Sequence, residues 1–347
     1  MREISFLPGP VSTHPECRRA FSKYPFSHRS ARFDNLIHTT ESLLCKLARA
    51  RYCTFLMGSG SLANEAVAAQ LALLSGRGLV VTNGEFGERL AEQATRLHLN
   101  FEQLNFDWGL PLDYEQVSRK LKSKQWIWLA YCETSTGTLN NIPQIIDMCR
   151  AKKIKVCVDS VSAIGCVPVN FSEIYLASGT SGKGLGAFPG ISFVLSNHCP
   201  ASSCSIPKYL DIGYYQEKKL VPFTFSSNLL AALKAGAAKS LRTDNSKKIK
   251  TISAGIEKFM QAYGIKHANS TGQRAYYMLT MALGSGVPSE KLGKFLSARG
   301  LLVHYRNTYL LQRNWVQIAL MGNVKIAESK KLIDAMQTFF EREKPAH

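Results

Sequence analysis

The sequence predicts an α/β protein: a large domain with a mostly parallel central sheet wrapped by helices, and a smaller C-terminal α+β domain. Two observations support this fold class. From about residue 53, short apolar runs alternate with stretches of helical spacing, a pattern typical of parallel sheets. After about residue 235 this alternation stops. We therefore expect an N-terminal segment at 1–20, a large domain at 21–235 and a small domain at 236–347.

Seven apolar runs predict the strands of the large domain. In order they are YCTFLM, GLVVTN, NFEQLNF, QWIWLAY, IKVCVD, EIYLAS and GISFVLS. Helices are expected between several of them, at SLANEAVAAQLALLS, GERLAEQATRLHL, DYEQVSRKLKS and PQIIDMCRAKK. In such sheets a ligand lies beyond the carboxyl ends of the strands, so the loops that follow the strands are where we expect the site.

The C-terminal part has a different order of elements. We expect a basic amphipathic helix at 246–262, a strand at AYYMLTMAL, a helix at 289–298, strands at LLVHY and WVQIALMG, and a last helix from Ile326. No internal repeat and no long linker separates the two parts. We therefore expect them to pack closely.

Composition narrows the class of protein. An apolar content of 45% and a charged content of 20% are ordinary for a soluble globular protein. The longest apolar runs, such as WIWLAY, fall short of the roughly 18 residues of a membrane helix, and the first residues do not resemble a signal peptide, so we expect a cytoplasmic protein. The cysteines contain no CxxC pair and form no spaced ligand set with the histidines, which predicts free thiols and no metal site.

The net charge of +18 raises the question of a polyanionic partner. The lysines and arginines are spread along the chain, with only short groups such as RAKKIK and NSKKIK. This spread does not indicate specific nucleic-acid binding. A field that attracts small anionic ligands is the simpler interpretation.

The first loop that is a candidate for ligand binding is GSGSLANEA, residues 58–66, between a strand and a helix. Its glycines permit a tight turn. The free N–H groups of Gly60, Ser61 and Leu62 at the helix start form an anion pocket that suits a phosphate, and the helix dipole reinforces it. The structural alternative is a plain helix start with Ser61 as the N-cap.

Asp159 and Lys183 follow two neighbouring strands of the predicted sheet. Asp159 ends the run KVCVD, where a buried carboxylate is costly without a cationic partner; the alternative is that it caps the next turn. Lys183 lies in SGTSGKGLGAFPG, where nearly every neighbour is small. A surface lysine needs no such clearance, whereas a lysine bonded to a bulky partner does. We expect both side chains to open onto one site.

A phosphate cradle, an acid for a protonated ring nitrogen and an uncluttered lysine together indicate pyridoxal 5′-phosphate. The lysine forms a Schiff base with the cofactor aldehyde. The acid keeps the pyridine nitrogen protonated, so that the ring accepts electrons from the substrate. No one of the three signals is specific, but their order and spacing together are.

The sequence resembles the class V aminotransferases, which have the pyridoxal-phosphate transferase fold of type I and include alanine:glyoxylate, serine:pyruvate and 2-aminoethylphosphonate:pyruvate aminotransferases. The resemblance rests on FLPGP, SHRSARF, GSGSLANEA, TNGEFGER, CETSTG, VDSVSAIG, SGKGLGAFPG and IALMG, which run through nearly the whole chain. It implies a transferase that moves an amino group from an amine or amino-acid donor to an oxo-acid by a ping-pong Schiff-base mechanism.

The resemblance also implies individual roles. Lys183 is the catalytic residue that forms the Schiff base and then moves a proton at the substrate Cα, and Asp159 holds the pyridine nitrogen. Val161 packs under the cofactor ring, and Phe86 stacks on its other face. Phosphate and ring-oxygen contacts are implied for Ser59, Gly60, Ser61 and Thr134. Thr224 completes the phosphate site of a partner subunit, which implies a homodimer with shared active sites.

The chain departs from the family pattern where the substrate is held. The arginine of the family motif RIGLLG, which pairs with the α-carboxylate, is replaced by Gln317 in QIALMG. Arg313 compensates if it shares the strand face of Gln317, unless the intervening NW bends the chain; Arg306 and Arg29 are the other candidates. Taken singly, each arginine has the alternative of a solvated surface position. As a set they favour an anionic substrate such as a phosphonate, or an amine without an α-carboxylate.

Two other functions stay open on the sequence. A lyase on the same fold, such as a desulfurase or decarboxylase, is one; a desulfurase needs an activated cysteine, for which the candidates are Cys132, Cys199 and Cys204. The other is a non-catalytic protein that binds nucleic acid or a partner through its basic surface. The Gln317 replacement favours the binding protein, whereas the intact Lys183 and Asp159 argue against it.

Overall fold

A seven-stranded sheet forms the centre of the computed structural model, which describes residues 3–269 and 272–343. The strand order is β2-β10-β9-β8-β5-β3-β4. The bounds are β2 (Tyr52–Gly58), β3 (Gly78–Thr82), β4 (Phe101–Asn105), β5 (Trp126–Ala130), β8 (Lys155–Asp159), β9 (Leu176–Thr180) and β10 (Gly190–Ser196). Within the described residues, β10 alone runs against its neighbours, so the prediction of a mostly parallel sheet is confirmed.

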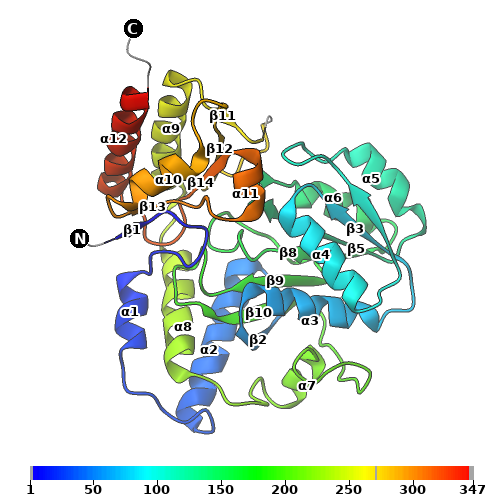
Figure 1. Cartoon of the computed structure of the whole chain (residues 1–347). Coiled ribbons are helices and arrows are strands. Elements are labelled where there is room, and N and C mark those ends of the chain that lie inside the picture. The colour runs from blue at the N-terminus through cyan, green and yellow to red at the C-terminus, as the bar shows by residue number, and fades with distance from the viewer. Residues whose placement is uncertain (1–2, 270–271, 344–347) are drawn as a thin grey trace.

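Helices cover both faces of this sheet (Figure 1). They are α2 (Ala31–Ala48), α3 (Gly60–Ala72), α4 (Glu85–Arg96), α5 (Tyr114–Lys120), α6 (Ile142–Arg150), α7 (Ile212–Glu217) and α8 (Ser227–Arg242). Apolar side chains of α2, α6 and α8 pack with Val81 and Leu129 on one face, and those of α3 and α4 pack with Val80 and Trp128 on the other. Successive strand residues point to opposite faces, so these strands are apolar at every position.

Two long helices, α2 and α8, lie outside the elements expected from the sequence. In each, a serine before the first turn accepts a hydrogen bond from a backbone N–H: Ser30 from Phe33, and Ser226 from Leu229. Helix α8 runs unbroken through residue 235, where the boundary between the predicted domains was placed. The division into domains stays a prediction.

The C-terminal elements gather in a separate group at the upper left of Figure 1. Strands β11 (Lys266–His267), β12 (Met278–Ala282) and β14 (Trp315–Ala319) make an antiparallel sheet. Apolar side chains of α9 (Ser246–Ala262), α10 (Ser289–Ser297) and α12 (Ile326–Glu343) share one core with those strands. Shorter elements are β1 (Ile4–Ser5), α1 (Pro15–Phe21), the 3-10 turn η1 (Leu121–Ser123), β6 (Cys132–Glu133), β7 (Thr138–Leu139), β13 (Leu301–Leu302) and α11 (Thr308–Arg313).

Two strands are shorter than expected. The run LLVHY forms only β13, which pairs in parallel with β1 from the N-terminal segment. The run AYYMLTMAL becomes a strand only at Met278. Its first residue, Ala275, instead donates its backbone N–H to the carbonyl of Gly137. Both differences arise from pairing with distant segments.

Some features are absent from residues 3–269 and 272–343. No helix there has the length and apolar character needed to cross a membrane. No group of three or more histidine, cysteine or acidic side chains is arranged to hold a metal ion. The cysteines are free thiols.

Gly179 in β9 leaves room for Phe193 of β10. A Cβ atom on Gly179 would lie 2.2 Å from Phe193 Cε2. We expect Gly179→Ala to lower the free energy of unfolding by about 1–3 kcal/mol, the usual cost of overpacking a core. Urea unfolding followed by circular dichroism measures the change. The cost should fall in a Phe193→Leu background, and an equal cost in both backgrounds would contradict the steric explanation.

Candidate functional site

The predicted site residues follow the carboxyl ends of parallel strands. Asp159 is the last residue of β8, and Lys183 lies in the loop after β9. Ser59 and Gly60 begin α3 directly after β2, and Phe86 lies in the first turn of α4 after β3. Because these strands point the same way, the loops that follow them meet at one edge of the sheet.

The Asp159 carboxylate joins several of these segments. Its Oδ2 accepts a hydrogen bond from Asn64 Nδ2 of α3 at 3.0 Å. Its Oδ1 accepts from the Val161 N–H at 2.9 Å and from Ser178 Oγ at 3.4 Å. Asp159 thus caps the following turn, the alternative raised by the sequence, and it does so while 8% exposed. All three donors are uncharged, so this buried carboxylate still has capacity for a cationic partner.

Lys183 points toward the loop after β8. Its Nζ donates a hydrogen bond to Ser162 Oγ at 2.9 Å and lies 5.4 Å from the centroid of the Phe86 ring. Burial lowers the pKa of Lys183 below its usual value, and the negative charge of Asp159 opposes the shift. A lowered pKa raises the fraction of neutral amine, the form that attacks a carbonyl carbon.

The glycines around Lys183 have a different cause from the one expected. A Cβ atom on Gly182 would lie 2.9 Å from Pro189 Cα, and one on Gly184 would lie 2.3 Å from the carbonyl oxygen of Ile164. The close approach of backbone segments therefore requires glycine at these positions. The interpretation of the small neighbours as clearance for a bulky partner of Lys183 is not required to explain these two glycines, and it stays a prediction.

The start of α3 retains two of the three N–H groups expected in the anion pocket. Ser59, not Ser61, is the N-cap residue, and its side chain makes no capping hydrogen bond. The Leu62 N–H donates to the Ser59 carbonyl at 2.9 Å, which leaves Gly60 and Ser61 as the donors. A Cβ atom on Gly60 would lie 2.7 Å from Val161 Cγ1, so glycine allows α3 to approach Val161.

Glu133 is a functional candidate that no sequence pattern singled out. Its buried carboxylate accepts hydrogen bonds from the N–H groups of Phe86 and Gly87 at 3.0 and 2.9 Å, and from the Ser135 N–H at 3.1 Å. Burial raises the pKa of Glu133, and these hydrogen bonds oppose the shift. The carboxylate caps α4 from outside and thereby fixes the position of Phe86. Only the contact between distant segments reveals this role.

The side-chain amide of Gln317 forms hydrogen bonds within the protein. Its Nε2 donates to the carbonyls of Thr134 and Ser135 at 2.5 and 2.9 Å and lies 3.0 Å from Thr280 Oγ1. Its Oε1 accepts from the Tyr309 hydroxyl at 3.1 Å. Both polar atoms of the buried amide are therefore satisfied, and neither is free to bind a substrate. Thr134 is itself only 2% exposed.

Arg313 does not share the strand face of Gln317. It ends helix α11, and Asn314 then takes the left-handed conformation, φ 55°, which turns the chain into β14. The guanidinium carbon of Arg313 lies 3.9 Å from the centroid of the Trp108 ring. Of the two alternatives that the sequence left open for Arg313, the bend is the one observed.

Arg306 and Arg313 both line a cavity of about 530 Å³, together with Arg89 and the acids Glu85 and Glu88. Arg89 connects this cavity to Phe86, because its guanidinium carbon lies 5.0 Å from the centroid of that ring. Arg89 is a second residue that the sequence did not single out. It is also paired with Glu85 at 2.8 Å, so its charge is partly neutralised.

Arg29 and Thr224 lie elsewhere in this chain. Arg29 Nη1 donates to the carbonyl of Val221 at 2.7 Å, in the loop that carries Thr224, and Thr224 is exposed. No hydrogen bond between described residues joins either of them to Lys183. The structure therefore brings these two predicted residues close to one loop but not to the rest of the site.

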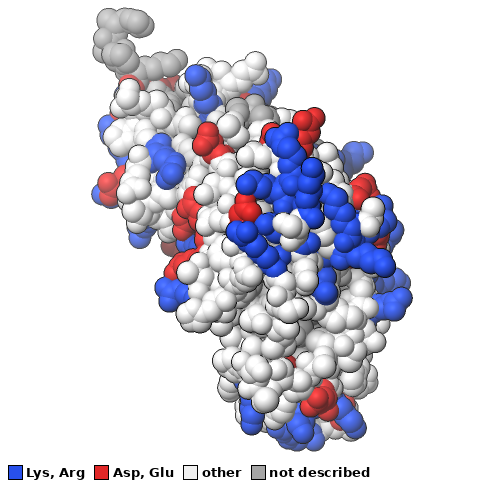
Figure 2. Space-filling view, turned by 90° about the vertical axis from the view of Figure 1, so that its right-hand side faces the viewer, with Lys and Arg blue, Asp and Glu red and all other residues white. Residues whose placement is uncertain are grey.

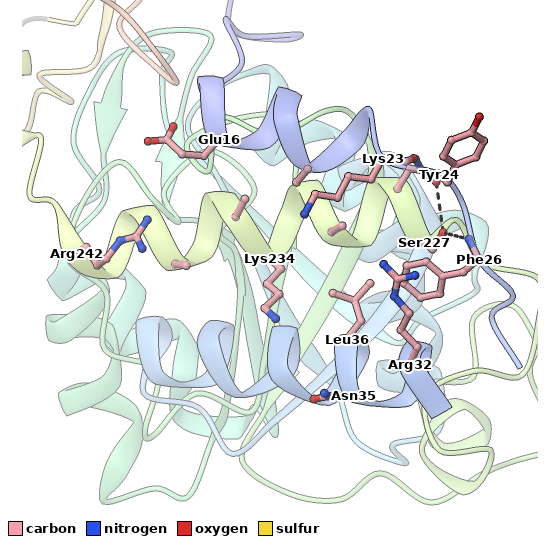
Figure 3. Close-up of a pocket in the computed structure, with 15 residues that line it drawn as sticks. Glu16, Lys23, Tyr24, Phe26, Arg32, Asn35, Leu36, Ser227, Lys234 and Arg242 are labelled. Atoms are coloured by element: carbon pink, nitrogen blue, oxygen red, sulfur yellow. Dashed lines mark hydrogen bonds between the residues drawn. The ribbon is translucent and has the colours of Figure 1, made fainter. Parts of the chain in front are cut away.

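A separate cavity of about 480 Å³ lies between α1, α2 and α8 (Figure 3). Lys23, Arg32 and Lys234 line it, and the Arg32 guanidinium carbon lies 4.1 Å from the centroid of the Phe26 ring. None of the predicted site residues lines this cavity. It is distinct from the site at the carboxyl edge.

The role of Glu133 can be tested by Glu133→Gln. The glutamine has one acceptor oxygen in place of two, so at least one buried N–H loses its partner. We expect the free energy of unfolding to fall by about 1–3 kcal/mol. Glu92→Gln at the exposed far end of α4 is the control and should cost less than about 0.5 kcal/mol. Equal costs in urea unfolding would rule out the capping role.

The comparisons agree with the motifs. The family model described as Aminotransferase class-V matches residues 22–201. The soluble hydrogenase 42 kDa subunit of Anabaena cylindrica is 31% identical over 245 residues, 65% of this chain and 63% of that protein. The 2-aminoethylphosphonate–pyruvate transaminase of Burkholderia thailandensis is 31% identical over 247 residues, 67% of each chain. The match to the Anabaena protein thus spans less than two thirds of its length.

A solved structure supports the same conclusion for the fold. The ureidoglycine-glyoxylate aminotransferase of Bacillus subtilis superposes with a TM-score of 0.90 at 21% identity, covering 100% of this chain and 95% of that one. At this identity the likeness establishes the fold alone. The resemblance drawn from the motifs is nevertheless confirmed by the family match. The chain belongs to the class-V aminotransferase family.

Proposed function

We propose that the protein is a pyridoxal-phosphate-dependent aminotransferase that moves an amino group from an amine donor to an oxo-acid. The observation that carries the proposal is the convergence of Lys183 and Asp159 at the carboxyl edge of the sheet, with Phe86 beside Lys183. Membership of the class-V family supports it. When bound, pyridoxal phosphate supplies an electron-accepting ring that stabilises negative charge on the substrate Cα.

The residues at this edge fit the cofactor. The buried Asp159 carboxylate has only uncharged donors, which suits a protonated ring nitrogen. The Gly60 and Ser61 N–H groups at the start of α3 suit a phosphate. Val161 and Phe86 offer apolar surface for the two ring faces.

The residues of the site then have separate roles. Lys183 binds the cofactor and moves a proton at the substrate Cα, aided by the lowered pKa of its amine. Asp159 keeps the ring nitrogen protonated and is itself oriented by Asn64. Glu133 orients Phe86 through the backbone of α4. Ser162 holds the Lys183 amine before the cofactor arrives.

The substrate's anionic group requires a partner other than Gln317, whose amide is already satisfied. We infer that Arg306 and Arg89 supply the positive charge from the cavity beside Phe86. The relative named as a 2-aminoethylphosphonate–pyruvate transaminase supports a donor with a phosphonate group.

A homodimer with shared sites is part of the proposal. Thr224 is exposed on the loop that Arg29 contacts, where a second copy of the chain has access to it. In a dimer this loop would bring Thr224 to the phosphate of the partner's cofactor. A cytoplasmic location stays a prediction.

The desulfurase alternative finds less support. Burial raises the pKa of the Cys132 thiol to about 12, which leaves little thiolate at neutral pH. Cys199 and Cys204 follow the end of β10, which pairs with the first residues of β2 and β9. The end of β10 lies at the opposite edge of the sheet from Lys183, and Cys199 follows it closely.

The absorbance spectrum of the purified protein tests the proposal. We expect a visible band of bound cofactor that an amine donor bleaches and that an oxo-acid restores. The donors to compare are α-amino acids, 2-aminoethylphosphonate and simple amines. Lys183→Ala should lack the native band, whereas Lys258→Ala, a change of an exposed lysine in α9, should keep it.

Each contrary result has its own meaning. A protein that binds no pyridoxal phosphate would overturn the enzyme proposal in favour of a non-catalytic binding protein. A protein that binds the cofactor and releases product from a donor without accepting its amino group would be a lyase. A phosphonate response that persists in Arg306→Ala, with the band intact, would contradict the proposed anion site.

The reactivity of Lys183 should depend on pH. Acetic anhydride in trace amounts labels the neutral amine of Lys183 in the cofactor-free protein. Because burial lowers the pKa of Lys183, we expect the midpoint of its labelling rate against pH to lie below the usual lysine pKa of about 10.4. Asp159→Asn removes a charge that raises this pKa, so the midpoint should move to still lower pH. Mass spectrometry of the Lys183 peptide, with free Nα-acetyl-lysine as the reference, measures both midpoints. A midpoint at or above that of the reference would contradict the burial argument.

A further inference from the structure

Lysine and arginine side chains gather on the side of the molecule where α5 lies, as Figure 2 shows. We call this group the amino-edge patch. It consists of Arg77, Arg119, Lys120, Lys122, Arg150, Lys152, Lys153 and Lys155, all exposed except the half-buried Lys155. The patch belongs to the edge of the central sheet at which the parallel strands begin.

The sheet brings these residues together from distant parts of the sequence. Gly78, Trp126 and Lys155 lie side by side at the beginnings of β3, β5 and β8. The turns that enter these strands, and the ends of α5 and α6, carry the basic residues. Lys152 Nζ lies 3.5 Å from the carbonyl of Ser118, so the turn after α6 contacts α5.

Few acids oppose this charge. Glu102 accepts ion pairs from Arg77, Lys120 and the buried Lys124, at 3.9, 2.7 and 2.9 Å. One carboxylate thus faces three cations, and the contact holds the pKa of Glu102 down, to about 2. The local charge is therefore strongly positive even where ion pairs form.

The remaining cations differ in their partners, because Arg150 has two acidic neighbours and others have none. Arg150 pairs with Glu173 at 2.6 Å and with Asp147 at 2.9 Å. For Arg119, Lys122 and Lys153 no ion pair occurs among the described residues. These three side chains carry uncompensated charge into solvent.

Helix ends account for part of the patch only. Arg119 and Lys120 lie in the last turn of α5, and Arg150 in that of α6, where a cation stabilises the helix dipole. Lys122 and Lys153 lie beyond those helices. Their positions are not explained by the helices they follow.

The kind of partner follows from what the patch lacks. The large apolar side chains exposed among the described residues, such as Tyr24, Tyr209 and Leu311, all lie outside it. A specific protein interface has an apolar centre with aromatic residues, and a membrane-binding surface usually adds inserted apolar side chains. A cationic surface without either fits a row of phosphates.

We propose that the amino-edge patch binds the phosphate backbone of single-stranded RNA without reading its bases. The spread of basic residues in the sequence argued against nucleic acid, but the fold removes that argument by gathering them. The patch lies at the opposite sheet edge from Lys183, so an RNA bound there leaves the proposed catalytic site open. The inference does not depend on the proposed aminotransferase function.

Fluorescence anisotropy of a fluorescein-labelled oligouridine tests the proposal. The variant is Lys122→Glu with Lys152→Glu and Lys153→Glu. Its matched control is Lys258→Glu with Lys330→Glu and Lys331→Glu, which changes the net charge equally on exposed positions of α9 and α12. We expect the affinity of the patch variant to fall by about tenfold or more. The plot of log K against log salt should flatten by about 0.7 for each phosphate that the variant no longer binds.

The control separates the patch from the net charge of +18. We expect it to keep its affinity within about threefold of the unchanged protein. An equal fall in affinity in both variants, or no binding by the unchanged protein, would overturn the proposal. Binding to phosphatidylserine vesicles in place of the oligouridine would also overturn it.

Two further measurements keep the result interpretable. Circular dichroism checks that both variants fold, and a set of Lys→Gln changes at the same positions replaces the glutamates if they do not. The cofactor band and its response to amines should be unchanged in the patch variant. RNA binding retained by the patch variant would overturn the proposal, and a loss of the amine response in that variant would contradict the separation of the patch from the proposed catalytic site.

Discussion

The buried carboxylate of Asp159 is the interaction on which the rest of the site depends. It accepts hydrogen bonds from α3, from the loop after β8 and from β9, so it joins two segments that carry proposed cofactor contacts to the strand that leads to Lys183. A buried carboxylate with only uncharged donors is costly. That cost is offset when a cationic group binds beside it, and the protonated ring nitrogen of the proposed cofactor is such a group.

Glu133 is a second buried acid, and it affects the site indirectly, through the backbone of other segments. Glu133 holds the first turn of α4, and the carbonyls of Thr134 and Ser135, which follow it, accept hydrogen bonds from Gln317 of β14. A continuous chain of polar contacts therefore links the C-terminal sheet to Phe86. The replacement of the family arginine by glutamine fits this arrangement, because a neutral amide satisfies these carbonyls without burying a charge.

The two edges of the central sheet have different characters. The carboxyl edge carries buried polar groups, short distances and a lysine whose pKa is lowered. The amino edge carries exposed cations with few acids near them. Parallel strands produce this separation, because all their beginnings lie on one side and all their ends on the other.

The sequence by itself determined much of the protein. The alternation of apolar runs and helical spacing predicts the seven strands, because these patterns are local consequences of burial. The motifs predict the family and place Lys183, Asp159 and Phe86 in loops that meet. The basic helix from Ser246 and the last helix from Ile326 begin where expected, because each apolar pattern is unbroken.

Only the tertiary structure decided the rest. The capping role of Glu133, the contact between Asn64 and Asp159 and the cations of the amino edge all depend on segments far apart in the sequence. The same holds for the glycines beside Lys183, which pack against backbone that no local pattern identifies. The sequence left two positions open for Arg313, and the left-handed residue Asn314, which follows helix α11, decided between them. Local patterns report which side chains are buried, whereas contacts between distant segments determine which polar groups meet.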